Sequence, residues 1–275
     1  MPPLTELTRW PPWAVMWALA AAIFAACKWL TWRYTPVPNA PAWRHVAYLV
    51  AWPGLDAKAF LDSRPLPRES RAGAGEWAFA FTKVAFGAAL VWGVTPLVPA
   101  EYLYPRAWVG MTGVVFVLHF GLFHLLSCAW RAAGVDAKPL MNWPLLAESV
   151  SEFWGKRWNL AFRDLTHRFL FRPLAGRLGA RAGVAAGFLF SGVVHDLVIS
   201  LPAGGGYGWP TLYFTLQGLG LLAERSKAGK RLGLGTGWRG RAFTAVVVVG
   251  PAFGLFHPPF VREVVLPFLD VLGAN

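Results

Sequence analysis

The chain has 275 residues, of which 56% are hydrophobic and 15% are charged, and its mean hydropathy is +0.43. Because soluble domains carry about 25% charged residues, this composition excludes an ordinary soluble fold and makes membrane lipids the main surroundings. The formal net charge is +12. However, Lys and Arg lie between apolar runs instead of along one face, which argues against a nucleic-acid partner.

Long apolar runs divide the chain, and a spanning helix needs roughly 20 apolar residues. The fourth run is long enough for two helices, because Pro and Gly residues between Pro202 and Pro210 predict a tight turn. The sequence therefore predicts an all-α polytopic membrane protein with about six transmembrane helices in a single membrane domain, residues 1–275. The runs are 10–27, 84–100, 107–130, 182–223 (interrupted only by Asp196) and 242–261.

Two further segments are predicted to lie at the membrane surface. Residues 45–55 are too short to cross and are interpreted as a re-entrant or interfacial helix, and residues 145–181 as a surface helix leading into the fourth span. A capping box, Ser149-Val-Ser-Glu152, predicts that a helix starts near Val150 and continues through Asn159. Its polar face would carry Glu148, Glu152, Gly155 and Asn159, and a separate aromatic stripe Trp154, Trp158 and Phe162.

Positive charge predicts the orientation of the chain. Segments 28–71, 131–181 and 225–241 hold 22 of the 26 Lys and Arg residues and alternate with the predicted spans. The positive-inside rule places these segments in the cytoplasm and both termini on the opposite side. High use of Ala, Arg, Gly and Trp favours a bacterial inner membrane.

His195 is the most informative polar residue. It follows Arg181 by 14 residues, which on a helix is about 20 Å into the membrane. Ionisable groups at that depth mark functional sites by default, although a neutral His bonded to a neighbouring helix is the alternative. Asp196 is either its partner or near the far surface. Gly183, Gly187, Ser191 and His195 recur every fourth residue, which predicts close helix packing or one wall of a narrow tunnel.

Asn159 has two interpretations. It is either solvated on an interfacial helix, or it faces an internal chamber.

The other polar residues of the apolar runs suggest no chemistry. His119 and His124 lie about 140° apart on a helix, so they cannot hold one ion from a single face, and no metal site is predicted. Gln217 has no assigned role, and His257 is interpreted as interfacial. Cys27 and Cys128 are expected to pack without forming a disulfide.

The segment Phe-Trp-Gly-Lys-Arg-Trp-Asn ending at Asn159 and the segment Ser-Gly-Val-Val-His-Asp containing His195 lie 36 residues apart. Together they resemble the wax synthase branch of the membrane-bound O-acyltransferase superfamily. Leu255-Phe-His-Pro258 also resembles the end of the wax synthase domain, so residues 145–260 are expected to form the catalytic region. Asp196 departs from the resemblance, because Glu is expected there.

The resemblance implies transfer of a fatty acyl group from acyl-coenzyme A, a co-substrate, to a long-chain alcohol, giving a wax ester without a cofactor. His195 would be the general base and Asn159 a hydrogen-bond donor. The expected substrate-binding residues are Trp154, Trp158, Lys156, Arg157 and Ser191. The alternatives are a sterol, a diacylglycerol or another hydroxyl acceptor, or a small membrane transporter or scaffold in which His195 relays protons or packs. Transporters commonly consist of two duplicated halves, and the sequence shows no such duplication, which argues against a transporter.

Overall fold

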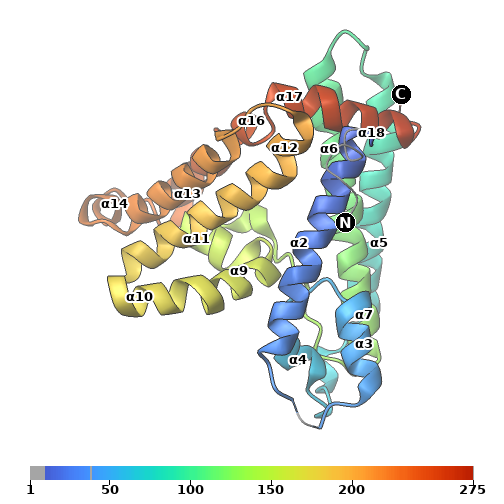
Figure 1. Ribbon diagram of the computed structural model, residues 1–275, viewed down its shortest axis with the longest axis vertical. Helices are drawn as coiled ribbons and strands as arrows, with labels where there is room; N and C mark the ends of the chain where they lie inside the picture. Colours follow the sequence, from blue (N-terminus) through green and yellow to red (C-terminus); the bar gives the residue numbers. More distant parts are fainter. Residues whose placement is uncertain (1–9, 38, 275) are drawn as a thin grey trace. The chain divides into compact units, whose positions relative to one another are not determined.

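The computed structural model describes residues 10–37 and 39–274, and every regular element in these two ranges is helical (Figure 1). The predicted all-α fold is therefore confirmed. The chain forms two compact units. The first unit comprises residues 10–22, 143–158 and 165–268, and the second comprises 23–142, 159–164 and 269–274.

The first unit contains the C-terminal half of the fold. Its helices are α8 (Val150–Glu152), α10 (Arg172–Leu178), α11 (Ala180–His195), α12 (Leu201–Ala203), α13 (Trp209–Arg225), α14 (Lys227–Leu232), α15 (Gly237–Val249), α16 (Ala252–Leu255) and α17 (Pro258–Phe260). The second unit contains α3 (Ala42–Ala51), α4 (Ala57–Leu61), α5 (Ala74–Ala88), α6 (Leu103–Val115) and α7 (Phe123–Ala132). Three helices begin in one unit and end in the other, namely α2 (Pro12–Arg33), α9 (Leu160–Thr166) and α18 (Leu266–Val271).

Several helices contain a wider π-helical turn. Such turns interrupt the regular ladder of hydrogen bonds and often occur at functional sites. The π-helical segments are Ala89–Val94, Phe116–Leu122, Phe153–Arg157, His167–Phe171, Asp196–Ser200 and Val261–Val265, and short 3₁₀ turns occur at Arg68–Ser70, Thr95–Leu97 and Pro144–Leu146.

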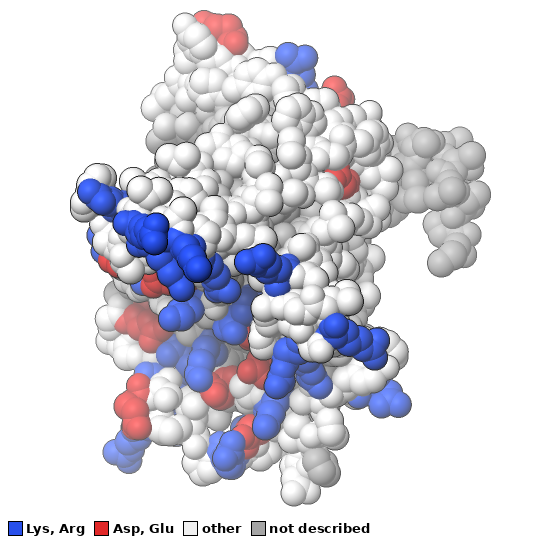
Figure 2. All heavy atoms as spheres, turned by 90° about the vertical axis from the view of Figure 1, so that its left-hand side faces the viewer, with Lys and Arg blue, Asp and Glu red and all other residues white. Residues whose placement is uncertain are grey.

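Within residues 10–37 and 39–274, four helical segments are long and apolar enough to cross a membrane: Pro12–Arg33, Arg68–Leu97, Leu103–Ala132 and Ala180–Ala203. A bent pair, Gly237–Leu255 and Pro258–Val271, meets the same test as one span with a 62° bend. The chain is therefore an integral membrane protein. Figure 2 shows basic side chains gathered in part of the face in view, beside a large area without charge.

The sequence predicts about six spans, whereas the structure supports four, or five with the bent pair. The difference lies in α13. It is helical as expected, but its 17 residues rise only about 26 Å, less than the roughly 30 Å hydrocarbon core.

The surface segments are also helical, but they are shorter than predicted. Residues 45–55 contain the end of α3, which stops at Ala51. Residues 145–181 do not form one surface helix, because short helices and π-helical turns replace it.

Close packing of α11 against α13 shapes the first unit (Figure 1). A Cβ atom added to Gly192 would lie 2.6 Å from the Cα atom of Thr211, so these backbones approach as closely as Gly permits. The ridge formed by Gly183, Gly187, Ser191 and His195, which recur every fourth residue, contributes differently. Gly183 packs against Phe171, while a Cβ atom on Gly187 would meet nothing within 4 Å. The closest contact therefore lies beside the ridge, at Gly192.

Candidate active site

His195 ends α11, immediately before the π-helical turn Asp196–Ser200. Its Nδ1 atom lies 2.6 Å from the backbone oxygen of Ser191. Because a carbonyl oxygen only accepts, Nδ1 carries the proton and Nε2 of the neutral ring keeps its lone pair. The imidazole is partly buried, and its centroid lies 4.4 Å from that of Phe214. This arrangement presents a proton acceptor at a fixed place.

Trp154 shares the Phe214 contact with His195. The Trp154 ring packs on Phe214, with centroids 5.6 Å apart, and edge-on against Phe188 at 5.9 Å. Its indole N–H donates to Gln217 Oε1 over 3.2 Å, and the Gln217 amide donates to the Val247 carbonyl over 2.7 Å. The structure therefore brings Trp154 and His195 together on one face of α13.

The same face of α13 also contacts the residues that lead into the aromatic motif, which is the Phe-Trp-Gly-Lys-Arg-Trp-Asn segment of residues 153–159. Glu224, which is 5% exposed, accepts hydrogen bonds from the backbone N–H groups of Val150 (2.7 Å) and Ser151 (2.9 Å) and from the Ser151 hydroxyl. The Ser149 hydroxyl accepts from Glu152 N over 2.9 Å, which confirms the predicted helix start. Glu224 fixes this start from a distant helix.

The helix predicted to continue through Asn159 ends earlier. Trp158 is extended, with φ −102° and ψ 128°, and Asn159 is left-handed, with φ 41°. Asn tolerates this conformation better than most residues, and here its Oδ1 accepts from Phe162 N over 3.2 Å to start α9. The predicted polar arc from Glu148 to Asn159 is therefore wrong, because a turn separates its members.

Asn159 belongs to the second unit. Its N–H points to Met141 Sδ at 3.2 Å, and the next residue, Leu160, donates its N–H to the Leu140 carbonyl over 3.0 Å. With Oδ1 used as the cap of α9, the hydrogen-bond donors of the Asn159 side chain are those of its amide nitrogen.

The remaining predicted binding residues have distinct surroundings. Trp158 stacks on Phe153 with centroids 5.7 Å apart, and Lys156 is exposed. Arg157 is engaged within the chain, because it forms a 2.7 Å ion pair with Glu152 and donates to the Trp143 carbonyl over 3.1 Å. The hydroxyl of Ser191 donates to the Gly187 carbonyl over 2.9 Å, so its link to His195 is its own backbone oxygen.

Two acidic residues outside the spans brace the aromatic motif. The pKa of Glu152 is lowered, most strongly by the hydrogen bond from the Glu148 backbone N–H and less strongly by the Arg157 guanidinium. The Gly237 backbone N–H and then Arg241 lower the pKa of Glu148. Both side chains are therefore held as carboxylates near neutral pH.

One group in the described chain has the spacing of metal ligands: the ligand atoms of Glu76, His124 and Cys128 lie within 4.8 Å of one another. Two basic side chains already contact this group: Arg131 donates to Glu76, and Lys83 Nζ lies 2.5 Å from His124 Nδ1. His124 Nε2 lies 2.9 Å from Glu76. A divalent ion would meet two positive charges here, so the donor set fits an ion-pair network better than a metal centre.

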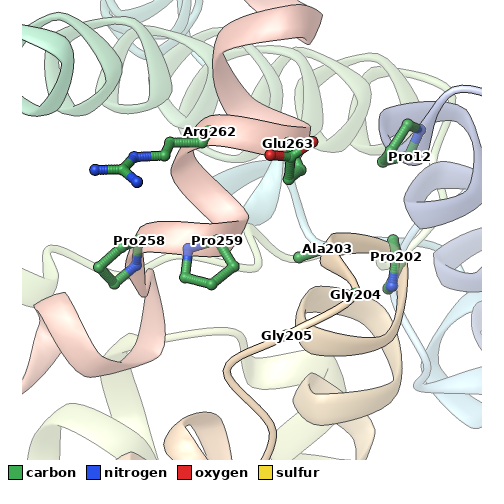
Figure 3. Close-up of a pocket in the computed structure, with 9 residues that line it drawn as sticks. All are labelled: Pro12, Pro202, Ala203, Gly204, Gly205, Pro258, Pro259, Arg262 and Glu263. Carbon is green, nitrogen blue, oxygen red and sulfur yellow. The ribbon is translucent and has the colours of Figure 1, made fainter.

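A pocket of about 360 Å³ lies elsewhere in the first unit (Figure 3). The loop after α12 and the Pro258-Pro259 pair form its walls, and Arg262 and Glu263 add charge. Neither His195 nor Asn159 lines it.

Sequence reasoning missed Glu224 and Phe214 and gave Gln217 no role. Positions 214, 217, 221 and 224 share one face of a helix, which was the available signal.

Residues 137–216 match the membrane bound O-acyl transferase family, and this match includes both Asn159 and His195. The chain is 30% identical to the probable long-chain-alcohol O-fatty-acyltransferase 9 of Arabidopsis thaliana over 202 residues, covering 68% of this chain and 58% of the relative. It is 33% identical to the probable long-chain-alcohol O-fatty-acyltransferase 2 of the same plant over 142 residues, which cover 47% of this chain and 41% of that relative. The long-chain-alcohol O-fatty-acyltransferase of Simmondsia chinensis is 29% identical over 121 residues, 38% of this chain and 34% of that protein.

The chain thus spans between about a third and 58% of the length of these three relatives. The matched region contains the His195 and Asn159 motifs, and the structure has the helices of a membrane protein. The chain belongs to the membrane bound O-acyl transferase family.

Proposed function

We propose that this protein transfers a fatty acyl group from acyl-coenzyme A to a long-chain alcohol, forming a wax ester and free coenzyme A. The observation that carries the proposal is the His195 imidazole, whose Nδ1 bonds to the Ser191 carbonyl on a helix long enough to span a membrane. The similarity to named long-chain-alcohol O-fatty-acyltransferases supports this acceptor class.

In the proposed reaction, His195 Nε2 takes the hydroxyl proton as the alcohol oxygen attacks the thioester carbonyl carbon. The carbon–sulfur bond then breaks, and the leaving sulfur takes the proton back from the imidazolium. General base catalysis of this kind contributes about 10²- to 10⁴-fold. No covalent acyl-enzyme and no cofactor is needed.

Asn159 would donate from its amide nitrogen to the oxyanion that forms on the carbonyl oxygen. Such a donor is worth about 10²- to 10³-fold in kcat. The indoles of Trp154 and Trp158 and the Ser191 hydroxyl would line the substrate path. Lys156 and Arg157 would meet the phosphates of the coenzyme at the water boundary.

In this proposal, which takes the four spans Pro12–Arg33, Arg68–Leu97, Leu103–Ala132 and Ala180–Ala203, the basic segments 28–71 and 131–181 lie in the cytoplasm, both termini lie on the other side, and the membrane is a bacterial inner membrane. The expected cytoplasmic position of segment 225–241 is not kept, because it would require α13 to cross the membrane. The distribution of Lys and Arg supports the orientation. Protease accessibility of a terminal tag in sealed inverted and right-side-out vesicles tests it. Cleavage only from the non-cytoplasmic side is expected, and cleavage from the cytoplasmic side contradicts it.

The function is tested in membranes from cells that express wild type, His195→Ala or His167→Ala. His167 is an exposed histidine of the first unit and serves as the matched control. Labelled palmitoyl-coenzyme A is supplied with hexadecanol, and with a sterol or a diacylglycerol in parallel reactions. Abundance is measured by immunoblot in the same membranes.

We expect wax ester from wild type and His167→Ala and none from His195→Ala at equal abundance. If ester formed only with the sterol or the diacylglycerol, acyl transfer would stand as the reaction, but the long-chain alcohol would be wrong as the acceptor. No ester from any acceptor would overturn the proposal and favour a transporter or scaffold.

A further inference from the structure

Asp196, the residue after His195, is bonded to three separate parts of the first unit. Its carboxylate accepts the Gly208 N–H over 2.8 Å, the Ser200 hydroxyl over 2.9 Å and the Thr211 N–H over 3.1 Å, and it also accepts the Thr211 hydroxyl. These four donors come from the π-helical turn Asp196–Ser200, from the glycine loop (residues 204–208, between α12 and α13) and from the first turn of α13. One carboxylate therefore joins the end of α11 to the start of α13.

His257 extends this network from the break before α17. Its Nδ1 accepts the Phe260 N–H over 3.2 Å, and because a backbone N–H only donates, the proton of the neutral ring is on Nε2. Nε2 lies 3.1 Å from the Ser200 hydroxyl, which therefore accepts from His257 and donates to Asp196. The chain of donors runs in one direction, from His257 through Ser200 to Asp196.

The glycine loop is shaped to admit His257, which is 1% exposed. Gly206 has φ 73°, and a Cβ atom there would lie 2.4 Å from the His257 ring. Pro258 and Pro259, which follow His257, form a wall of the pocket shown in Figure 3, opposite Pro202 and Gly204. Ser200 and His257 thus fasten the two walls of this pocket.

The network is connected to His195 through contacts on both α11 and α13. Thr211, bonded twice to Asp196, is one turn before Phe214 on α13, and Phe214 is the ring against which His195 packs. Gly192 contacts the Thr211 backbone one turn before His195 on α11. Sliding or separating α11 and α13 would therefore displace the imidazole directly.

We propose that Asp196, held by Thr211, Ser200 and His257, is a positioning residue that fixes the register of α11 on α13 and so holds the His195 imidazole in place for acyl transfer. The inference rests on the proposed function. His257 acts only through Ser200 and Asp196 and does not touch the reacting atoms.

The test uses pairs of variants of the full-length protein, purified in detergent, with kcat and KM measured per folded molecule. Thr211→Val removes one donor at constant shape, and Thr211→Ser restores it. His257→Leu removes the ring nitrogens, whereas His257→Gln keeps a donor for Ser200. Asp196→Asn turns an amide N–H toward donor groups.

A misplacement of about 1 Å costs about 100-fold in rate, so we expect kcat to fall roughly 10- to 100-fold in Asp196→Asn, Thr211→Val and His257→Leu. KM for both substrates should change less than about threefold, and the Ser and Gln variants should recover most of kcat. Unchanged kcat per folded molecule in Asp196→Asn or Thr211→Val overturns the inference. Equal losses in His257→Gln and His257→Leu overturn the positioning role of His257.

Hydrogen exchange over residues 192–214 gives a readout that does not depend on ester formation. We expect faster exchange in Thr211→Val than in Thr211→Ser. If wild type made no ester, the proposed function would fail, while unchanged exchange in Thr211→Val would separately overturn the tie between the helices.

Discussion

The Nδ1 atom of His195 donates its proton to the backbone oxygen of Ser191, 2.6 Å away on the preceding turn of α11. The tautomer of the imidazole is therefore set by the main chain, one turn from the ring itself. No neighbouring carboxylate is needed to orient the imidazole, and Asp196 instead bonds to α13.

Ser191→Ala distinguishes the role of the Ser191 hydroxyl from that of its backbone carbonyl. The carbonyl that bonds to His195 remains, and the hydroxyl lost is one that donates within the helix to Gly187. We expect kcat to stay within about twofold of wild type, and any contribution of the hydroxyl to substrate binding to appear as a higher KM. Steady-state kinetics with hexadecanol as the varied substrate measures both. A loss of kcat with unchanged KM would show that the hydroxyl acts in the chemical step.

Asn159→Gly and Asn159→Ala distinguish the effect of the backbone turn at residue 159 from the effect of the side-chain amide. The left-handed φ of 41° costs an ordinary residue about 1–2 kcal/mol, a cost that Gly avoids. Both variants lose the cap of α9, which costs about 1 kcal/mol with Ala and only a few tenths with Gly. We therefore expect thermal unfolding in detergent to show a Gly variant close to wild type and a less stable Ala variant.

Ester formation should nevertheless fall by about 100-fold or more in both variants, because both lack the amide donor. Retention of activity in Asn159→Gly, with loss in Asn159→Ala, would reduce Asn159 to a residue that shapes the turn.

Acid should weaken the brace around the aromatic motif. The pKa of Glu152 is lowered in the folded protein, so its contribution to stability is complete above the ordinary Glu pKa of about 4.3 and is lost as the pH falls through the lowered value. We expect the midpoint of thermal unfolding to be nearly constant from pH 7 to about pH 5 and to drop below about pH 4. Glu152→Gln should be less stable at pH 7, and its curve should approach that of wild type in acid.

Glu101→Gln, at an exposed position in the other unit, is the control and should follow wild type throughout. Parallel curves for wild type and Glu152→Gln across the whole range would refute a role for this carboxylate in acid stability.

The sequence identified His195 because an ionisable residue is conspicuous in an apolar run, and the contact with Phe214 could not have been deduced from it. It also placed the helix start at Ser149 correctly, since a capping box depends on residues three apart. Asn159 was misplaced for a different reason. Periodicity extended the helix through a turn that depends on Leu140 and Met141, about 20 residues earlier in the chain.

Glu224 shows the same limit, because its partners are backbone groups more than 70 residues away, and a backbone N–H has no signature in sequence. The ridge of small residues was recognised, but the partner helix decides which small residue makes the contact. That residue is Gly192, one position away from Ser191 of the ridge.

Gly192→Ala and Gly187→Ala therefore form a matched pair on α11. At Gly192 a Cβ atom would lie 2.6 Å from Thr211 Cα and 3.1 Å from its hydroxyl, so α13 must move away. Overpacking of this kind costs about 1–3 kcal/mol, and the movement also shifts His195 from Phe214. At Gly187 nothing lies within 4 Å, and Ala favours a helix by up to about 1 kcal/mol. We expect lower thermal stability and a kcat reduced at least tenfold in Gly192→Ala, and neither change in Gly187→Ala.

The Gly187 variant carries further information when acyl-coenzyme A donors of increasing chain length are compared. If the space beside Gly187 is the predicted tunnel, the added methyl group shortens the longest acyl chain accepted while kcat for shorter chains is kept. If that space is filled by membrane lipid, the chain-length profile matches wild type, and the small-residue ridge serves packing alone. Equal tolerance of Ala at both positions would instead show that α11 and α13 are not held in the close register on which His195 depends.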